Sequence, residues 1–235
     1  MTAYERAIKR GRWLIARRKF LPVALLAGCV LALLLATPFR VIHGQQWLTV
    51  LSAVLAISGI ALYALASAPA AFHAARREEG PVLLPEYVAA GGIYSITRFP
   101  TYTANLLLVA ALSLYTGVVW FTVGMVLVAM MCTGWILLAQ EHTLHSRYGD
   151  VFTQWCRETY ALTPFFLSWQ PWKIPVNPLR LLLGQAHTAA VVTGVFALTN
   201  LVKNWRVDFE LRVDVPWLVI FGACLVLALL FGRNK

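Results

Sequence analysis

Charged residues are scarce in this 235-residue chain: Asp, Glu, Lys and Arg together make up 13% of it, and apolar residues make up 60%. Soluble proteins carry about 25% charged and about 45–50% apolar residues. Several stretches of about 20 residues carry no charge at all. This composition excludes a water-soluble globule, and it equally excludes intrinsic disorder, which requires few apolar residues and a high net charge.

Cysteine is also rare, and Cys29, Cys132, Cys156 and Cys224 show no CxxC spacing. A disulfide scaffold is therefore excluded, and we interpret the four as small apolar residues. The sequence contains no P-loop, GxGxxG or GxSxG motif, which argues against a soluble-type nucleotide domain and a nucleophile elbow. It shows neither a repeat of fixed period nor a low-complexity tract.

The sequence does have long apolar segments. A helix needs about 20 apolar residues to cross a hydrocarbon core of about 30 Å. Six stretches meet or approach this length: 20–36, 47–72, 100–115, 118–139, 179–202 and 215–231. Only Thr116 and Gly117 separate the third from the fourth, which predicts a tight antiparallel hairpin. The predicted fold class is all-α: a polytopic transmembrane helical protein with about six spans, plus interfacial helices.

The basic residues give the predicted orientation. With a cytoplasmic N-terminus and six crossings, 16 of the 20 Lys and Arg residues fall on the cytoplasmic side, as the positive-inside rule requires. Both termini are then cytoplasmic, and the net charge of +10 needs no nucleic acid partner. Residues 1–36 could instead be a secretory signal, but the long basic region at 1–19 favours an uncleaved anchor.

We divide the chain into three parts. Residues 1–75 hold the basic leader and the first two spans, and residues 179–235 hold the last two. Residues 76–178 form a core with a re-entrant cytoplasmic loop, the helical hairpin and an interfacial segment.

The loop at 76–99 leads directly into the third span. Pro100 suits the first turn of that helix, because its missing N–H is not needed there. Arg98 then lies at the membrane boundary beside a helix N-terminus, and both features favour an anion. An arginine that only snorkels to lipid phosphate is the alternative.

The second cytoplasmic segment, 140–164, begins with Gln140 and Glu141. A carboxylate at the end of a helix opposes the macrodipole, so Glu141 needs a cationic partner: a ligand group, Arg98 or Arg147. His142 and His145 lie beside it with i, i+3 spacing, but no third His or Cys is nearby, and we predict no metal site.

Apolar residues in and after this segment predict contact with the membrane interface. A stripe at helical spacing favours an interfacial helix, with a break at Gly149. The stripe consists of Leu144, Tyr148, Val151 and Trp155. An aromatic cluster follows, which is either an interfacial belt or the wall of a lipid cavity. The cluster consists of Phe165, Phe166, Trp169 and Trp172.

Two blocks of this core resemble a known family. The first block is Gly92-x-Tyr94-x-x-x-Arg98-Phe99-Pro100-x-Tyr102. It resembles the G-x-Y-x-x-x-R-H-P-x-Y block of the isoprenylcysteine carboxyl methyltransferase family. The second block is Gln140-Glu141-x-x-Leu144-x-x-x-x-Gly149-x-x-Phe152-x-x-Trp155. It is similar to that family's E-E-x-x-L-x-x-x-[FY]-G-x-x-Y-x-x-Y block, and phospholipid methyltransferases share a related core.

The resemblance implies an integral membrane methyltransferase that uses S-adenosylmethionine on the cytoplasmic side and takes a lipid-like substrate from the bilayer. Arg98 would face the acidic group being methylated, and Glu141 would pair with the amino group of the cofactor. The other implied cofactor-binding residues are Gly92, Tyr94, Pro100, Tyr102 and Gln140.

Two departures from the family pattern keep other functions open. Phe99 replaces a histidine and Gln140 replaces the first glutamate of a pair. A carboxylate or phosphate acceptor is already ionised near pH 7, so its methylation needs no strong general base. The alternatives are an NADPH-dependent reductase of a sterol or polyprenoid, for which Arg98, Arg147 and Arg157 would bind phosphates, and a non-catalytic lipid-binding relative.

Overall fold

The computed structural model describes residues 2–17, 20–36, 44–68, 91–162, 169–172, 177–209 and 211–231. Within these residues all the regular secondary structure is helical, apart from one isolated antiparallel bridge between Gly92 and Gln170. The predicted all-α class is thus confirmed. The helices are α1 (Ala3–Arg17), α2 (Leu21–Leu35), α3 (Gly44–Ala66), α6 (Ile93–Ile96), α7 (Pro100–Tyr115), α8 (Val119–Glu158), α9 (Pro178–Gly184), α10 (Ala186–Asp208) and α11 (Val215–Phe231).

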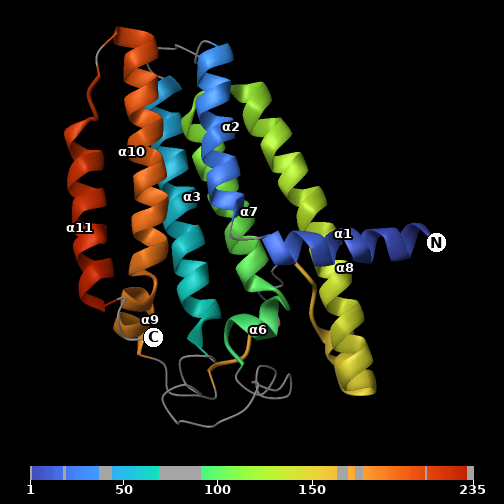
Figure 1. Ribbon diagram of the computed structural model, residues 1–235. Coiled ribbons are helices and arrows are strands. Elements are labelled where there is room, and N and C mark those ends of the chain that lie inside the picture. Colours follow the sequence, from blue (N-terminus) through green and yellow to red (C-terminus); the bar gives the residue numbers. More distant parts are fainter. Residues whose placement is uncertain are drawn as a thin grey trace.

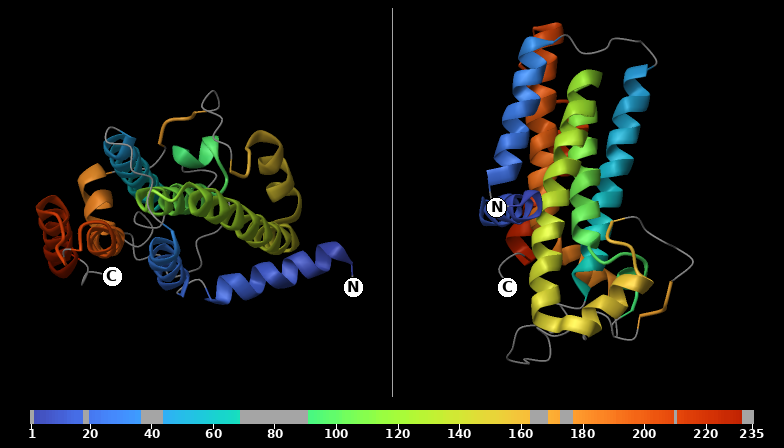
Figure 2. Two further views of the ribbon diagram at one scale, coloured as in Figure 1. Left: turned by 90° about the horizontal axis from the view of Figure 1, so that it is seen from above. Right: turned by 90° about the vertical axis from the view of Figure 1, so that its right-hand side faces the viewer.

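Most of the helices form an upright bundle in which successive long helices run in opposite directions (Figure 1). Helix α7 is central and packs against α2, α3, α8 and α10. Helix α1 lies across α8, and its axis makes an angle of 89° with that of α2. We call the end of the bundle that carries α6 and α9 the α6 end, and the opposite end, where α7 turns into α8, the hairpin end (Figures 1 and 2).

Two helices are long and apolar enough to cross a membrane, at Gln46–Ala66 and Val119–Asp150. The number rises to four if each of two bent helix pairs, α1 with α2 and α9 with α10, counts as one span. Helix α11 is apolar but shorter. The structure thus supports a membrane protein with two to four candidate spans, and the number six stays a prediction.

The main core lies where α2, α3, α7, α8 and α10 meet. Small residues on α2 and α7, among them Cys29, Ala32, Ala104 and Ala111, are almost fully buried, which lets these helices approach closely. At the hairpin end Tyr115, Phe196 and Trp217 form an aromatic group, in which the rings of Phe196 and Trp217 stack with centroids 4.7 Å apart.

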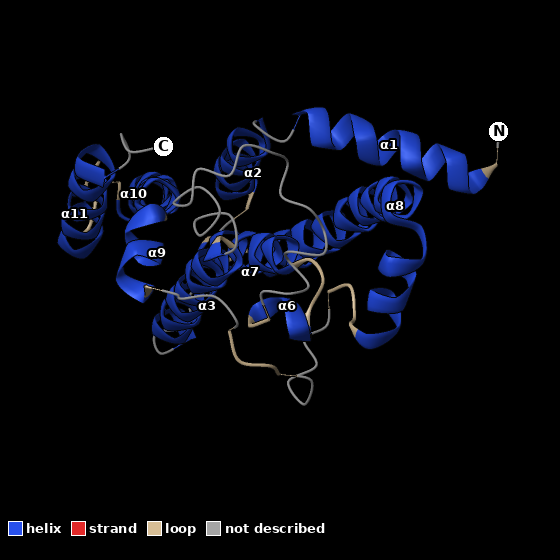
Figure 3. Ribbon diagram, turned by 90° about the horizontal axis from the view of Figure 1, so that it is seen from below, coloured by secondary structure: helices blue, strands red, loops and turns tan. Residues whose placement is uncertain are grey.

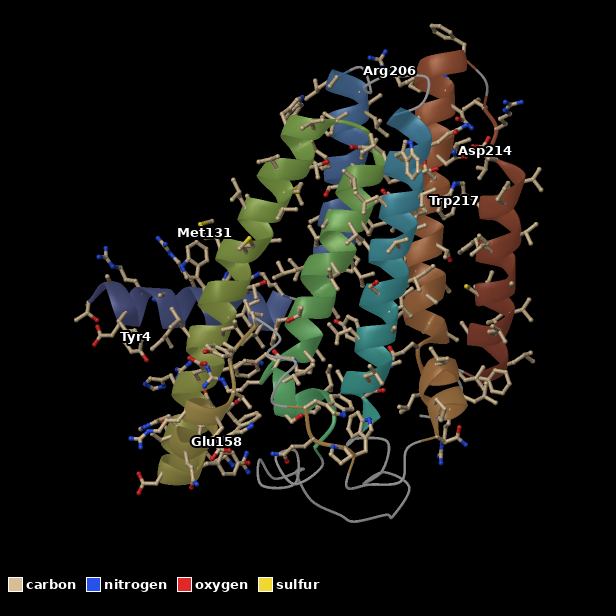
Figure 4. All side chains as sticks on the ribbon, turned by 180° about the vertical axis from the view of Figure 1, so that it is seen from behind. Tyr4, Met131, Glu158, Arg206, Asp214 and Trp217 are labelled. Atoms are coloured by element: carbon tan, nitrogen blue, oxygen red, sulfur yellow. The ribbon has the colours of Figure 1, made fainter. Side chains whose placement is uncertain are left out.

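Basic side chains at the hairpin end bind the carbonyl groups at helix C-termini. Lys203 Nζ donates to the carbonyl oxygen of Tyr115, at 3.4 Å. Arg206 donates through Nε to Leu33 O and through Nη2 to Leu34 O, both at 3.2 Å. These carbonyls have no partner inside their own helices, so both cations stabilise the bundle (Figure 4).

The hairpin follows the prediction closely. Helix α7 begins with Pro100 in its first turn and ends at Tyr115. Thr116 Oγ1 donates to Ser113 O at 2.7 Å, and Gly117 has a φ of +73°. Glycine takes this left-handed conformation without a steric cost, and α8 starts two residues later.

Helix α8 departs from the prediction, which ended the span at 139 and placed a separate interfacial helix after it. The helix continues without interruption to Gly149, where φ is +52° and ψ is −122°. Residues 140–148 contain neither Gly nor Pro and continue the same helix, so the expectation of a separate helix after 139 was wrong, whereas the predicted break at Gly149 is confirmed. Beyond it the chain turns away from the axis of the preceding part of α8 and lies to one side of the bundle (Figures 2 and 3).

Two further predicted features need correction. The stretch 179–202 is divided between α9 and α10, which meet at an angle of 51° next to Gly184. Part of the interfacial stripe faces protein, because Trp155 is buried with Phe152 and packs against Tyr94 and Leu144. Phe165, Phe166 and the loop at 76–90 lie outside the described residues.

Candidate functional site

Arg98 lies at the α6 end, just before the first turn of α7. Its backbone N–H donates to Tyr160 O at 2.9 Å, and that of Phe99 donates to Ala161 O at 3.2 Å. The Thr97 hydroxyl also donates to Ala161 O, at 3.1 Å. The segment that follows α8 therefore runs beside residues 97–99 and fixes the backbone that carries Arg98.

Arg98 and Glu141, 43 positions apart in the sequence, form an ion pair. The distance from Nη2 of Arg98 to Oε1 of Glu141 is 3.0 Å. The Arg98 side chain is only 11% exposed and that of Glu141 is 30% exposed. Arg98 Nε is buried and lacks a hydrogen-bond partner within the described part of the chain, so the guanidinium retains a donor for an additional acceptor.

A second polar pair lies next to the first along both helices. Gln140 Nε2 donates to the hydroxyl oxygen of Tyr102 at 2.6 Å. The Phe99 ring, which is buried, meets the Tyr102 ring edge-on with centroids 6.2 Å apart. Four residues expected at the site, Arg98, Tyr102, Gln140 and Glu141, are therefore brought together where α7 meets α8.

Gly92 and Tyr94 have contacts that explain them without a ligand. Gly92 has a φ of +63°, and the Trp172 ring occupies the space that a Cβ would need. Its N–H donates to Gln170 O at 2.9 Å. The Tyr94 hydroxyl donates to Ala66 O, at the C-terminus of α3, at 2.9 Å. Trp172 is thus partly buried against Gly92, whereas Trp169 is exposed, and an interfacial belt or a cavity wall stays a prediction for this cluster.

Cys156 lies beside the ion pair on the part of α8 that follows Gly149. Burial raises the pKa of this thiol, and the Glu141 carboxylate raises it too, while the Arg98 guanidinium opposes the increase. A raised pKa keeps the thiol protonated near neutral pH. Cys156 therefore packs beside Tyr94 and Trp155 as a neutral thiol. It adds no negative charge to the site.

Glu141 also faces a cavity of about 260 Å³. The wall is formed by one residue of α1 and several of α8: Tyr4, Glu141, His142, His145, Ser146 and Phe152. The Tyr4 and His142 rings approach each other, with centroids 6.4 Å apart. Among the described residues no three His, Cys, Asp or Glu side chains are placed to hold a metal ion.

Tyr4 is the lining residue that the sequence did not indicate. It belongs to the basic leader, and no local pattern relates it to Glu141. The available signal was the amphipathic pattern of residues 3–17, which predicts that one face packs on something but not on what.

An NADPH molecule would need several arginines around its phosphate groups. The three candidates, Arg98, Arg147 and Arg157, differ in exposure and in their partners. Arg147 is exposed, with its guanidinium 5.6 Å from the centre of the Tyr148 ring. Arg157 is exposed, and the charge of the enclosed Arg98 is balanced by Glu141. These observations give no support to NADPH binding.

A comparison of the chain with family models, with curated proteins and with solved structures finds no match. The chemistry of the site must therefore be inferred from its residues and their geometry.

Proposed function

We propose that this protein is an integral membrane methyltransferase. In this proposal it transfers the methyl group of S-adenosylmethionine to the carboxylate or phosphate of a lipid or isoprenoid-type substrate. The chain crosses the membrane about six times, with both termini and the α6 end on the cytoplasmic side.

The observation that carries the proposal is the contact between Arg98 and Glu141. The two blocks that resemble the methyltransferase family meet through this pair and through Tyr102 and Gln140. Each block has modest specificity by itself. Their meeting at one end of the bundle, beside a cavity, is what a shared site requires.

The distribution of basic residues supports the proposed orientation. Helix α1, α9 and the far part of α8 carry exposed arginines towards the α6 end (Figure 1). At the hairpin end Lys203 and Arg206 are bound to helix C-termini. Among the described residues most of the exposed arginines thus lie away from the hairpin end, where Arg212 is also exposed, and this excess is the one expected of a cytoplasmic face.

The residues at the cavity have the chemistry that the cofactor needs. The Glu141 carboxylate can accept from Arg98 and from a second cationic donor at once, because it has about four acceptor positions. The cavity of about 260 Å³ is somewhat smaller than the ~300–1,000 Å³ of sites that enclose small molecules. Full binding therefore requires an outward movement of the wall, for which the exposed first turn of α1 is the available element.

In the proposed mechanism the protein positions two oppositely charged partners and excludes water. When bound, the cofactor would supply an electrophilic methyl group for transfer to the acceptor oxygen. Glu141 would hold the ammonium group of the cofactor, and Arg98 would hold the acceptor oxyanion through its remaining N–H groups. Because Arg98 also lowers the nucleophilicity of that oxygen, its benefit is orientation.

The test is incubation of the full chain, in detergent micelles, with methyl-labelled S-adenosylmethionine and a total membrane lipid extract. We expect label in the lipid fraction, released by mild base if the acceptor is a carboxylate and resistant to it if the acceptor is a phosphate. Labelling should fall strongly in Arg98→Ala and less in Arg98→Lys. Arg147→Gln, which removes an exposed charge from the same region, is the matched control and should retain activity. Absence of lipid label, or equal activity of both Arg98 variants and the native chain, would contradict the proposal; label on headgroup amines would contradict the acceptor.

A non-catalytic lipid-binding protein is the second candidate, and one observation favours it. The polar side chains of the site are already paired with one another, Arg98 with Glu141 and Tyr102 with Gln140, and within the described residues only Nε of Arg98 is left without a partner among the groups of these two pairs. Calorimetric titration with S-adenosylhomocysteine separates the two candidates. The methyltransferase should bind it and Glu141→Gln should weaken binding, whereas no heat at millimolar ligand would favour the second candidate.

A further inference from the structure

A separate cavity of about 500 Å³ lies between α1 and α8. Six residues line it, three basic and three apolar, none of which lines the Glu141 cavity: Arg6, Lys9, Arg10, Trp13, Leu14 and Trp135. We call this cavity the α1 groove. We propose that the α1 groove binds the headgroup and upper acyl region of an anionic membrane phospholipid.

Helix α1 packs on α8 through one face, which fixes the shape of the groove. Ile8 and Gly11 are buried there, and a Cβ added to Gly11 would overlap the carbonyl oxygen of Trp135. The close approach brings the Arg10 guanidinium to 5.0 Å from the centre of the Trp135 ring. The basic residues are thus held at the edge of a defined contact between two helices.

The one acidic residue of α1 is already used elsewhere on the helix. Thr2 N donates to Oε2 of Glu5 at 2.9 Å, and Glu5 N donates to the Thr2 hydroxyl at 3.2 Å. This reciprocal pair is a capping box, which satisfies the free N–H groups of the first turn. Glu5 does not line the groove, so the charge of Arg6, Lys9 and Arg10 is available to an anion.

The shape and chemistry of the groove match a phospholipid. Its volume falls within the ~300–1,000 Å³ of small-molecule sites. Because α1 is nearly perpendicular to α2, it lies parallel to the membrane plane when α2 spans the bilayer. Helices in that position with Lys, Arg and Trp bind anionic lipids. The three cations suit the phosphate, and the walls formed by Trp13, Leu14 and Trp135 suit glycerol and acyl carbons, which a free phosphate lacks.

The experiment measures lipid binding to the full chain in detergent micelles by native mass spectrometry, with phosphatidylglycerol, phosphatidylcholine and inorganic phosphate as separate probes. Each cation near an anionic lipid changes affinity by about fivefold. We therefore expect Arg6→Gln/Lys9→Gln/Arg10→Gln to weaken phosphatidylglycerol binding by about 100-fold, and each single substitution to weaken it by about fivefold. Binding of phosphatidylcholine should be weak and unchanged.

A matched control removes the same charge from outside the groove: Arg12→Gln/Arg157→Gln/Arg180→Gln should bind phosphatidylglycerol like the native chain. The proposal is wrong if this control loses as much affinity as the groove variant, or if the groove variant keeps native affinity. It is also wrong if phosphatidylcholine binds as tightly as phosphatidylglycerol, or if inorganic phosphate alone displaces the lipid. No methyl transfer is measured, so these outcomes are independent of the proposed function.

Discussion

The ion pair between Arg98 and Glu141 predicts an asymmetric response to the removal of either charge. Glu141→Gln leaves a guanidinium that is only 11% exposed without a counter-charge. Breaking a buried pair from one side costs about 3–5 kcal/mol, and we expect the lower value of about 3 kcal/mol, since the amide still accepts one hydrogen bond. Arg98→Met leaves a carboxylate that is 30% exposed and can be hydrated, so its cost should be about 1.5 kcal/mol, between surface and buried pairs.

The double variant Arg98→Met/Glu141→Gln leaves neither charge unpaired and should cost about 2.5 kcal/mol, which corresponds to a coupling energy of about 2 kcal/mol. The assay is reversible unfolding in mixed micelles of dodecyl maltoside and dodecyl sulfate, which gives the free energy of unfolding of each variant. Arg180→Gln, on α9, combined with Glu141→Gln is the control cycle and should be additive within about 0.5 kcal/mol. A coupling energy near zero, or a larger cost for Arg98→Met than for Glu141→Gln, would refute the reasoning from exposure.

Three further outcomes follow from the structure. Gly92→Ala should lower the free energy of unfolding by more than about 2 kcal/mol, because a positive φ and overlap with a tryptophan ring add together; chemical unfolding measures this. Gly149→Ala has open space around its Cβ and should cost only the strain of a sparsely populated backbone conformation, about 1–3 kcal/mol, whereas the helical control Gly124→Ala should be neutral or stabilising; equal effects of the two would contradict the break. Cys156 has a raised pKa and should be alkylated by iodoacetamide at pH 8 more slowly than glutathione. Glu141→Gln, which removes one of the charges that raise this pKa, should speed that reaction; mass spectrometry of the modified peptide over a pH series checks both statements.

The sequence predicted the helix ends that lie at a proline or a glycine. Helix α7 begins at Pro100 and the hairpin turns at Gly117, as expected, and α8 breaks at Gly149. The expected separate helix after 139 was wrong, because a fall in hydrophobicity marks where a helix leaves an apolar environment and not where its backbone hydrogen bonds stop. The bend next to Gly184 was missed, since an isolated glycine in an apolar stretch has no fixed meaning.

The sequence predicted which residues belong to the site, but not which of them interact with one another. Arg98 and Glu141 were both identified from their positions at helix ends, yet a carboxylate that needs a cation is satisfied equally well by an arginine or by a ligand. The structure shows that Arg98 is the cationic partner of Glu141. The position of Tyr4 at the site could not be predicted from the sequence, because the crossing of α1 and α8 depends on a long-range contact between Gly11 and Trp135.

Helix α1 connects the two cavities, and this has a thermodynamic consequence if both bind their proposed ligands. Tyr4 closes the Glu141 cavity, and residues about half a turn to three turns further along the same helix line the α1 groove. A movement of α1 that admits a ligand to Glu141 must also alter the groove, because a helix moves as a rigid rod over this length. Linkage then requires that an anionic lipid and an occupant of the Glu141 cavity change each other's affinity by the same factor. A lipid that holds α1 against α8 should weaken binding at Glu141, and measuring S-adenosylhomocysteine affinity with and without phosphatidylglycerol, and the reverse, tests this reciprocity.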